Sequence, residues 1–177
     1  MRSKPVRPIV FALVVLSLAS AVSFASDVRA EGSAACAAWL TASEVETALG
    51  VALETIDPVE YSAGFTVCSW AKDRPEGQLG VNLSFFELKA IREGMISAES
   101  IPEYFDLQVS STQDTSGAEP QKLDGIGKRA VLFSEEGLWI VMIELEKGFV
   151  HLAISPSDIA RAQVVAVSKA VDSHAKE

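Results

Sequence analysis

The stretch from Cys36 to Trp70 constrains the fold most strongly, because it contains both cysteines of the chain and its clearest helix signal. The tetrapeptide TASE at positions 41–44 matches a capping box, in which the Thr41 hydroxyl accepts from the Glu44 N–H and the Glu44 carboxylate accepts from the Thr41 N–H. Gly50 can adopt the left-handed conformation that ends a helix. The pattern predicts a helix of about two turns, which is too short to be stable without tertiary support.

Residues 1–30 have the three-part pattern of a secretory signal peptide. Basic residues precede an almost wholly apolar run from Ile9 to Ala25, and small-residue cleavage patterns end at Ala25 and at Ala30. The apolar run is shorter than the roughly 20 residues that span a bilayer, so a permanent membrane anchor is the weaker alternative. We expect residues 1–30 to be cleaved and residues 31–177 to form one domain. The protein should then be periplasmic or extracellular, with no stable membrane span after signal cleavage.

Export determines how the two cysteines are interpreted. In an oxidising compartment, Cys36 and Cys68 are expected to form a disulfide, and a catalytic thiol is the less favoured alternative. The bond should contribute on the order of 3–4 kcal/mol on the chain-entropy model. Lipidation of Cys36 is a further alternative because small residues precede it, although the leucine usual in a lipidation motif is missing.

The net charge narrows the classes of partner. The full chain has a formal charge of −9, and without residues 1–30 the charge is −12, because that segment contains four basic residues and one acidic residue. Nucleic acids and anionic membranes bind clusters of Lys and Arg, so neither is expected as a partner. A basic protein or a cationic small molecule fits better, although solubility alone also explains an acidic surface.

Alternation of apolar and polar residues predicts a sheet. The strands expected are residues 65–71, 79–85, 129–133, 138–145 and 149–154. The first two should pair as a hairpin around a turn at residues 73–77, and the last three should form a meander with glycine turns. The strand at 138–145 is apolar on both faces, so we expect it to lie inside the sheet with both faces covered.

Helical spacing predicts two further helices. One covers about residues 86–97, with Leu88, Ile91 and Met95 on its apolar side. The other opens at residues 155–158 and covers one face of the sheet. We expect residues 52–64 to form a connecting loop, and residues 110–121 to be either a mobile polar loop or the longest excursion from the fold. The prediction is an α+β domain: an antiparallel sheet of about five strands, two or three helices packed on it, and one disulfide.

The second face of the strand at 138–145 must meet a helix, a ligand or a partner chain. We favour the helix from Leu88 to Met95 as its cover, with any binding cleft at the edge of that helix. Such a cleft would be lined by the residues Leu138, Ile140 and Met142 and by the loop at 110–121. Trp70 or Trp139 should be substantially buried.

No motif in the chain specifies a reaction. GIGKRA at positions 125–130 matches a loose dinucleotide fingerprint, but a strand follows the glycines where phosphate binding requires a helix, so we interpret it as a structural turn. His151 and His174 have no metal-ligand spacing, and neither GxSxG nor CxxC occurs. We therefore predict no catalytic residue, no metal ligand and no cofactor.

Several of these motifs together resemble a family of small secreted bacterial proteins, many of them lipoproteins, known as domain of unknown function 3558 (DUF3558). The resemblance rests on Cys36, LTASEV at 40–45 with ALG at 48–50, CSW at 68–70, and GIG at 125–127 before Ala130, and it covers most of the chain after residue 30. The family has no established activity. The related folds, those of extracytoplasmic sensor domains of bacterial kinases and of PsbP-like lipoproteins, imply binding rather than catalysis.

We therefore expect an exported, non-enzymatic binding or interaction module of the bacterial cell envelope, for a small molecule or an envelope protein. One alternative is an envelope hydrolase whose catalytic residues are dispersed along the chain. Another is an immunity-type inhibitor of a secreted toxin, which the acidic charge fits. A pocket with converging Ser, His and acidic groups would favour the hydrolase, and an apolar cleft the binding module. The sequence specifies no ligand and no oligomeric state.

Overall fold

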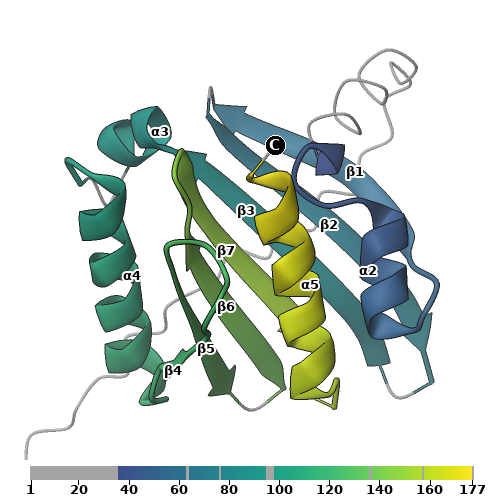
Figure 1. Ribbon diagram of the computed structural model, residues 1–177. Helices are drawn as coiled ribbons and strands as arrows, with labels where there is room; N and C mark the ends of the chain where they lie inside the picture. Colours follow the sequence, from purple (N-terminus) through teal and green to yellow (C-terminus); the bar gives the residue numbers. More distant parts are fainter. Residues whose placement is uncertain are drawn as a thin grey trace, which may run out of the picture.

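The structure is a computed structural model that describes residues 36–62, 64–75, 77–94, 98–135, 137–156 and 158–176. The predicted signal peptide lies outside the described residues. Within them, seven strands form one antiparallel sheet and four helices pack on it (Figure 1). The predicted α+β class is confirmed, with more strands than expected.

The sheet has the strand order β1-β2-β3-β7-β6-β5-β4. The strands are β1 (Glu54–Ser62), β2 (Phe65–Arg74), β3 (Gly77–Glu87), β4 (Gln121–Lys122), β5 (Arg129–Glu135), β6 (Leu138–Glu144) and β7 (Gly148–Ser155). The predicted hairpin of β2 and β3 and the predicted meander of β5, β6 and β7 are both confirmed. Pairing of β3 with β7 joins the two meanders into one sheet.

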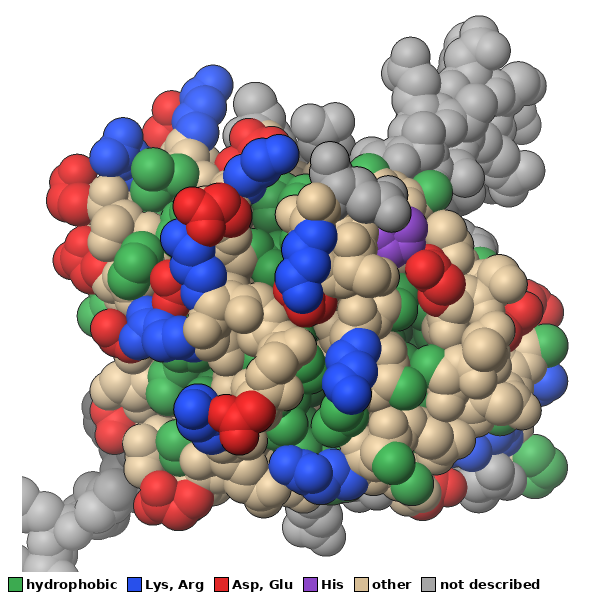
Figure 2. All heavy atoms as spheres, in the orientation of Figure 1, with side chains coloured by type: hydrophobic (Ala, Val, Ile, Leu, Met, Phe, Trp, Pro, Cys, Tyr) green, Lys and Arg blue, Asp and Glu red, His purple; other side chains and the backbone are tan. Residues whose placement is uncertain are grey.

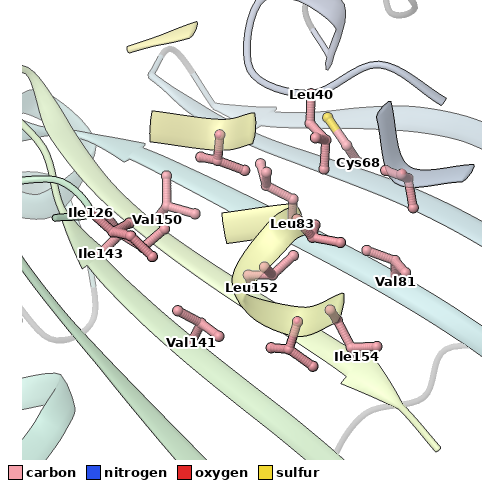
Figure 3. Packing of buried hydrophobic residues seen from close by; sticks show 14 of the residues in the cluster. Leu40, Cys68, Val81, Leu83, Ile126, Val141, Ile143, Val150, Leu152 and Ile154 are labelled. Atoms are coloured by element: carbon pink, nitrogen blue, oxygen red, sulfur yellow. The ribbon is translucent and has the colours of Figure 1, made fainter. Parts of the chain in front are cut away.

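The helices lie on both faces of this sheet. They are α2 (Ala42–Leu49), α3 (Leu88–Glu93), α4 (Ile101–Ser116) and α5 (Arg161–His174). Helices α2 and α5 cover the first face, over a core formed by alternate residues of the strands (Figures 1 and 3). Figure 3 shows ten labelled members of this core: Leu40, Cys68, Val81, Leu83, Ile126, Val141, Ile143, Val150, Leu152 and Ile154.

Helix α2 is held by its caps, by the disulfide and by α5. The Thr41 N–H donates to Glu44 Oε2 at 2.8 Å and the Glu44 N–H donates to Thr41 Oγ1 at 3.3 Å, so the predicted capping box is confirmed. Gly50 ends the helix in the left-handed conformation, with φ +71°. From α5, Gln163 Nε2 donates to the Leu49 carbonyl at 2.7 Å, which satisfies one of the free carbonyls at the end of α2. The helix therefore depends on tertiary contacts, as expected for a helix of only two turns.

The Cys36–Cys68 disulfide is confirmed, and its Cα atoms are 5.8 Å apart. It ties the segment before α2 to the middle of β2. A sulfur in a disulfide cannot also carry a thioether-linked lipid, and the chain contains no third cysteine. The bonded form of Cys36 thus excludes lipidation at this residue.

Helices α3 and α4 cover part of the second face through a cluster rich in aromatic residues. Tyr104 of α4 packs edge-on against Phe149 of β7, with ring centroids 5.1 Å apart. Buried members of the cluster are Ile91, Ala98, Tyr104, Phe105, Phe133, Ile140, Met142 and Phe149. The predicted cover was the helix from Leu88 to Met95. The larger share comes instead from α4, while α3 contributes Ile91.

Arg129 fastens α4 to the edge of the sheet. Its guanidinium bonds to the Glu144 carboxylate, to Asp106 Oδ1 at 2.7 Å and to the Pro102 carbonyl at 3.1 Å. The same group lies 4.5 Å from the ring centroid of Phe105. Glu144 is only 4 % exposed, so the arginine compensates a buried charge while it positions the helix.

The predicted mobile loop at residues 110–121 was wrong, because residues 110–116 complete α4. The Ser100 hydroxyl accepts from the Glu103 N–H at the start, and Gly117, with φ +69°, ends the helix. The second half of α4 is polar and packs little against the sheet. Its sequence therefore lacks the apolar residues at helical spacing that would have predicted a helix. Hydroxyls of Thr115 and Ser116 bond to carbonyls one turn earlier.

The predicted loop at residues 52–64 was also wrong. Residues 54–62 form β1, an edge strand paired with β2. The register between the two strands shifts between Ile56 and Val59, on either side of Pro58. Proline lacks the N–H that a central strand needs, but an edge strand with an irregularity tolerates it.

Two helix boundaries also differ from the predictions. The last helix begins at Arg161 rather than at residues 155–158, because Ser155 still belongs to β7 and Asp158 pairs with Arg74 at 3.4 Å. The helix predicted at residues 86–97 is α3, which begins at Leu88; residues 95–97 lie outside the described residues. Phe86, which was expected in that helix, lies in β3 instead and packs against the aromatic cluster.

Candidate functional site

The second face of the sheet is covered over only part of its width. The cluster beneath α3 and α4 includes residues of β3, β5, β6 and β7 but no described residue of β1 or β2. We call the part of the second face that this cluster leaves out, over β2, β3 and the adjacent side of β7, the open face; Ala71 and Gly80 in it are buried. Helices α2 and α5 pack on the first face of β2, β3 and β7, and in the described part of the chain the cluster beneath α3 and α4 does not extend over the open face.

Strand register gives the layout of the open face. Ser69 of β2, Asn82 of β3 and Ala153 of β7 lie side by side in one row, and Ser84 and His151 lie in the next. The face is therefore lined mainly by small and neutral polar residues: Val67, Ser69, Asn82, Ser84, His151 and Ala153. All six are at least partly exposed. Their neighbours along the strands point to the first face and are buried in the core.

The polar groups of the open face suit hydrogen bonding to a neutral ligand group. Ser69 Oγ donates to Asn82 Oδ1 at 2.7 Å, which leaves the Asn82 amide N–H groups directed to other partners or to water. Ser84 and His151 are cross-strand neighbours on the same face. The side chains of these two rows offer hydrogen-bond donors and acceptors, and none of them carries a formal charge.

His151 is neutral at physiological pH. Protein atoms surround most of its partly exposed ring, and this desolvation lowers its pKa from 6.5 to about 4. Among the described residues, no hydrogen bond joins Ser84 to His151 and no carboxylate bonds to the ring. A histidine that activates a serine must be hydrogen-bonded to the serine hydroxyl, and a carboxylate or similar group usually orients its ring.

The three predicted ligand-lining residues lie elsewhere. Ile140 and Met142 are 8 % and 0 % exposed, packed in the aromatic cluster beneath α4, and Leu138 is partly buried against it. A ligand could contact Ile140 or Met142 only if α4 moved away from the sheet. Their role in binding stays a prediction. The expected burial of a tryptophan is confirmed, since Trp70 is 2 % exposed.

The glycine motif at 125–127 makes a structural turn. Gly127 has φ +56°, its N–H donates to Asp172 Oδ1 at 2.9 Å, and a Cβ at this position would lie 2.5 Å from the Glu144 carbonyl oxygen. A shallow depression of about 190 Å³ adjoins this turn. Its charged groups already pair with one another, Lys128 with Glu146 at 2.7 Å and Lys176 with Asp172 at 2.6 Å. They are therefore poorly placed to hold a ligand.

His174 belongs to the contact between α5 and α2. Its Nε2 lies 2.9 Å from both carboxylate oxygens of Glu44. Burial raises the pKa of Glu44, but hydrogen bonds from Thr41 and the interaction with His174 outweigh burial, and the pKa lies below its ordinary value. The contact serves to position α2. In the view of Figure 2, acidic and basic side chains are intermixed over the visible surface.

Two further properties concern only the part of the chain that the structure describes. It contains no group of three or more His, Cys, Asp or Glu side chains that could hold a metal ion. None of its helices is both long enough and apolar enough to span a bilayer.

The residues of the open face were individually visible in the sequence but were not recognised as a group. Alternation in β3 already placed Asn82 and Ser84 opposite the buried residues, and the same alternation placed His151 opposite Val150 and Leu152. What was missing is the pairing of β3 with β7, which brings the two sets together. Comparisons with known proteins do not supply a function, since no family model, curated protein or solved structure matches this chain.

Proposed function

We propose that this protein is an exported, non-enzymatic binding module of the cell envelope, and that the open face is its binding surface. One observation carries the proposal: α2 and α5 pack on the first face of β2, β3 and β7, whereas in the described part of the chain the cluster beneath α3 and α4 leaves out β2 and part of β3 on the second. An antiparallel sheet often has one solvated face, and the partly exposed residues of this face carry hydrogen-bonding groups that suit contacts with a partner.

The chemistry of the open face favours binding over hydrolysis. Ser84 and His151 are adjacent but not hydrogen-bonded, and the low pKa of His151 makes it a weak base. The Ser69–Asn82 pair and the small residues around it offer contacts without an activated nucleophile. These features support a surface that recognises a partner without changing it covalently.

Export is the second part of the proposal. The Cys36–Cys68 disulfide supports it, since such bonds are rare in reducing compartments. The leader pattern of residues 1–30 supports it independently. The proposed relationship to DUF3558 agrees with these features: its shared motifs correspond here to the disulfide, the capped helix α2 and the Gly127 turn.

The experiment is a pull-down from cell-envelope extract with residues 31–177 as bait. Ser69→Tyr places a bulky neutral side chain on the open face, and Ala166→Tyr places the same side chain on the exposed side of α5 as a matched control. Thermal unfolding of all three proteins checks that the variants fold. We expect wild type and Ala166→Tyr to retain the same protein or ligand and Ser69→Tyr to lose it. Equal retention by all three would exclude the open face as the binding surface.

A further inference from the structure

We propose that the Cys36–Cys68 disulfide is a redox-dependent switch for the docking of α2. When both cysteines are reduced, residues 36–50 leave the sheet while the rest of the domain stays folded, and oxidation docks them. The inference rests on the proposed export for its setting and does not involve the open face. Three observations lead to it: where the bond is attached, how few other contacts hold α2, and how deeply the two sulfurs are buried.

The disulfide determines whether the segment that carries α2 is attached to the sheet at one end or at both. At its C-terminal end, the chain leads from Gly50 through residues 51–53 into β1. At its N-terminal end, the bond joins Cys36 to the middle of β2. Among the described residues, loss of the bond leaves the segment covalently attached through residues 51–53 alone. A segment attached at both ends gains less conformational entropy when it leaves the sheet, so the bond favours the docked state.

Helix α2 has little that would keep it in place without the bond. It has 8 residues, fewer than the roughly 12–15 at which an isolated helix becomes marginally stable in water. The helix itself buries only Val45 and Leu49. Leu40, just before the helix, is also buried and lies beside the sulfur of Cys68 (Figure 3). These few apolar contacts must hold the whole segment once the crosslink is absent.

The remaining elements hold one another without α2. Strands β2, β3, β7, β6 and β5 pair in sequence across the sheet, and α5 buries Val164, Val167 and Val171 on the first face. Helix α5 makes two polar contacts with α2, from Gln163 to one end and from His174 to the other (Figure 1). Release of α2 therefore removes one edge of the helical layer and leaves the sheet and α5 in contact.

The burial of the sulfurs sets the order of oxidation and docking. Cys36 is 4 % exposed and Cys68 is 1 % exposed. Thiol–disulfide exchange requires a sulfur that the reaction partner can reach, so the bond forms while α2 is released. In that step the two thiols give two electrons and two protons to a disulfide-containing oxidant, which becomes a dithiol. In a reducing compartment α2 stays released, and the first face is completed only after export.

Amide hydrogen exchange and thiol alkylation test the inference on residues 31–177. The oxidised protein is compared with the same protein after reduction in denaturant and refolding under reductant. We expect the amides of α2 to lose nearly all their protection in the reduced protein, while those of β3 and β7 remain protected. Both thiols of the reduced protein should react with an alkylating reagent within about tenfold of their rate in denaturant, whereas docking of α2 would slow them at least about a hundredfold.

Two variants supply the controls. Cys36→Ser with Cys68→Ser should reproduce the exchange pattern of the reduced protein without any reductant. His174→Ala removes a polar contact between α5 and α2 but keeps both attachments of the segment, so α2 should stay protected. Protection of α2 that survives reduction would overturn the inference, and so would loss of α2 protection in His174→Ala. Loss of protection in α2, β3 and β7 together would also overturn it, because the bond would then hold the whole domain. None of these outcomes affects the pull-down with Ser69→Tyr, which tests the proposed function separately.

Discussion

Single residues determine two features of the fold that their types alone do not reveal. Gly127 combines a left-handed backbone with close approach to the Glu144 carbonyl, and its N–H supplies a partner for the buried Asp172 carboxylate. His151 places an imidazole on the open face in an environment that keeps it neutral. Both residues depend on contacts with segments far away in the chain.

Gly127→Ala should be strongly destabilising. The left-handed conformation costs a residue with a Cβ about 1–2 kcal/mol, and the new methyl group would also collide with the Glu144 carbonyl and Ile143. We expect a loss of about 3 kcal/mol or more in the free energy of unfolding, measured from denaturant curves. Gly125→Ala is the matched control: it has φ +74° but nothing within 4 Å of its Cβ, so its loss should be about 1–2 kcal/mol. Equal losses would contradict the close approach at Gly127.

His151 should make stability depend on pH between 6.5 and 4. Its pKa is about 4 in the folded protein, against 6.5 for an ordinary histidine, so in this window the unfolded chain binds a proton that the folded chain does not. Stability therefore falls as pH falls from 6.5 to 4, by up to about 3 kcal/mol. The cross-strand neighbours Ser84 and Met142 do not titrate in this range. The wild-type stability minus that of His151→Gln should show this slope; a flat difference would contradict it.

The helices show how caps and anchors decide which segments fold. Helix α2 has two turns and little surface of its own, yet its capping box, Gly50 and the Gln163 contact fix both ends. Helix α4 has few apolar residues after Tyr104 and Phe105, and Arg129 ties its first half to the sheet. Each helix is therefore specified partly by contacts with another element.

Thr41→Ala should destabilise the protein by about 1 kcal/mol, because the Glu44 N–H loses its acceptor at the start of α2. The control is Thr47→Ala in the same helix, whose hydroxyl bonds only to the Ser43 carbonyl at an exposed position. Thr47→Ala should change stability by less than about 0.5 kcal/mol. Denaturant midpoints of the three proteins give the comparison. An unchanged midpoint for Thr41→Ala would mean that the cap contributes nothing.

Arg129→Ala should loosen α4. It leaves the buried Glu144 carboxylate without its partner, a change that costs about 3–5 kcal/mol for a buried pair. Amide hydrogen exchange should quicken in α4 more than in α5. Lys128→Ala, which removes an exposed ion pair with Glu146, should cost at most about 1 kcal/mol. Replacing Arg129 and Glu144 together by methionine should recover most of the stability; failure to do so would contradict the role of the buried charge.

At the scale of the whole molecule, one crosslink and one long-range strand pairing unite the parts. The disulfide joins the N-terminal segment to β2, and the β3–β7 pairing joins the two meanders. In the described part of the chain, the same arrangement places two helices on one sheet face and an aromatic cluster over only part of the other.

The disulfide should be complete in the purified protein. Titration with a thiol reagent under denaturing, non-reducing conditions should give essentially no reactive thiol, and two per chain would contradict the bond. Replacing Cys36 and Cys68 together by serine should cost about 3–4 kcal/mol, because the two cysteines are 32 positions apart in the sequence and the bond restricts that loop in the unfolded chain. Equal stability of the variant and the oxidised wild type would show that the crosslink adds nothing.

The sequence by itself determined the features that depend on neighbours a few residues apart. The capping box of α2, the alternation in β2 and β3, and the glycine turns of the meander each involve local hydrogen bonds or a short period, so they could be recognised without coordinates. The disulfide followed from there being two cysteines and a predicted signal peptide. The assignment of Trp139 and Met142 to opposite faces of β6 followed from a period of two.

Only the tertiary structure decided which surfaces those elements bury. The polar half of α4 and the proline in β1 are both typical of loops. The first is helical because α4 packs on the sheet along one side. The second lies in a strand because β1 pairs with β2 at the edge of the sheet. The open face exists because β3 pairs with β7 across a long stretch of chain while α4 lies over only one half of the sheet. Local sequence cannot specify such an arrangement, since the free energy that selects it comes from contacts between distant segments.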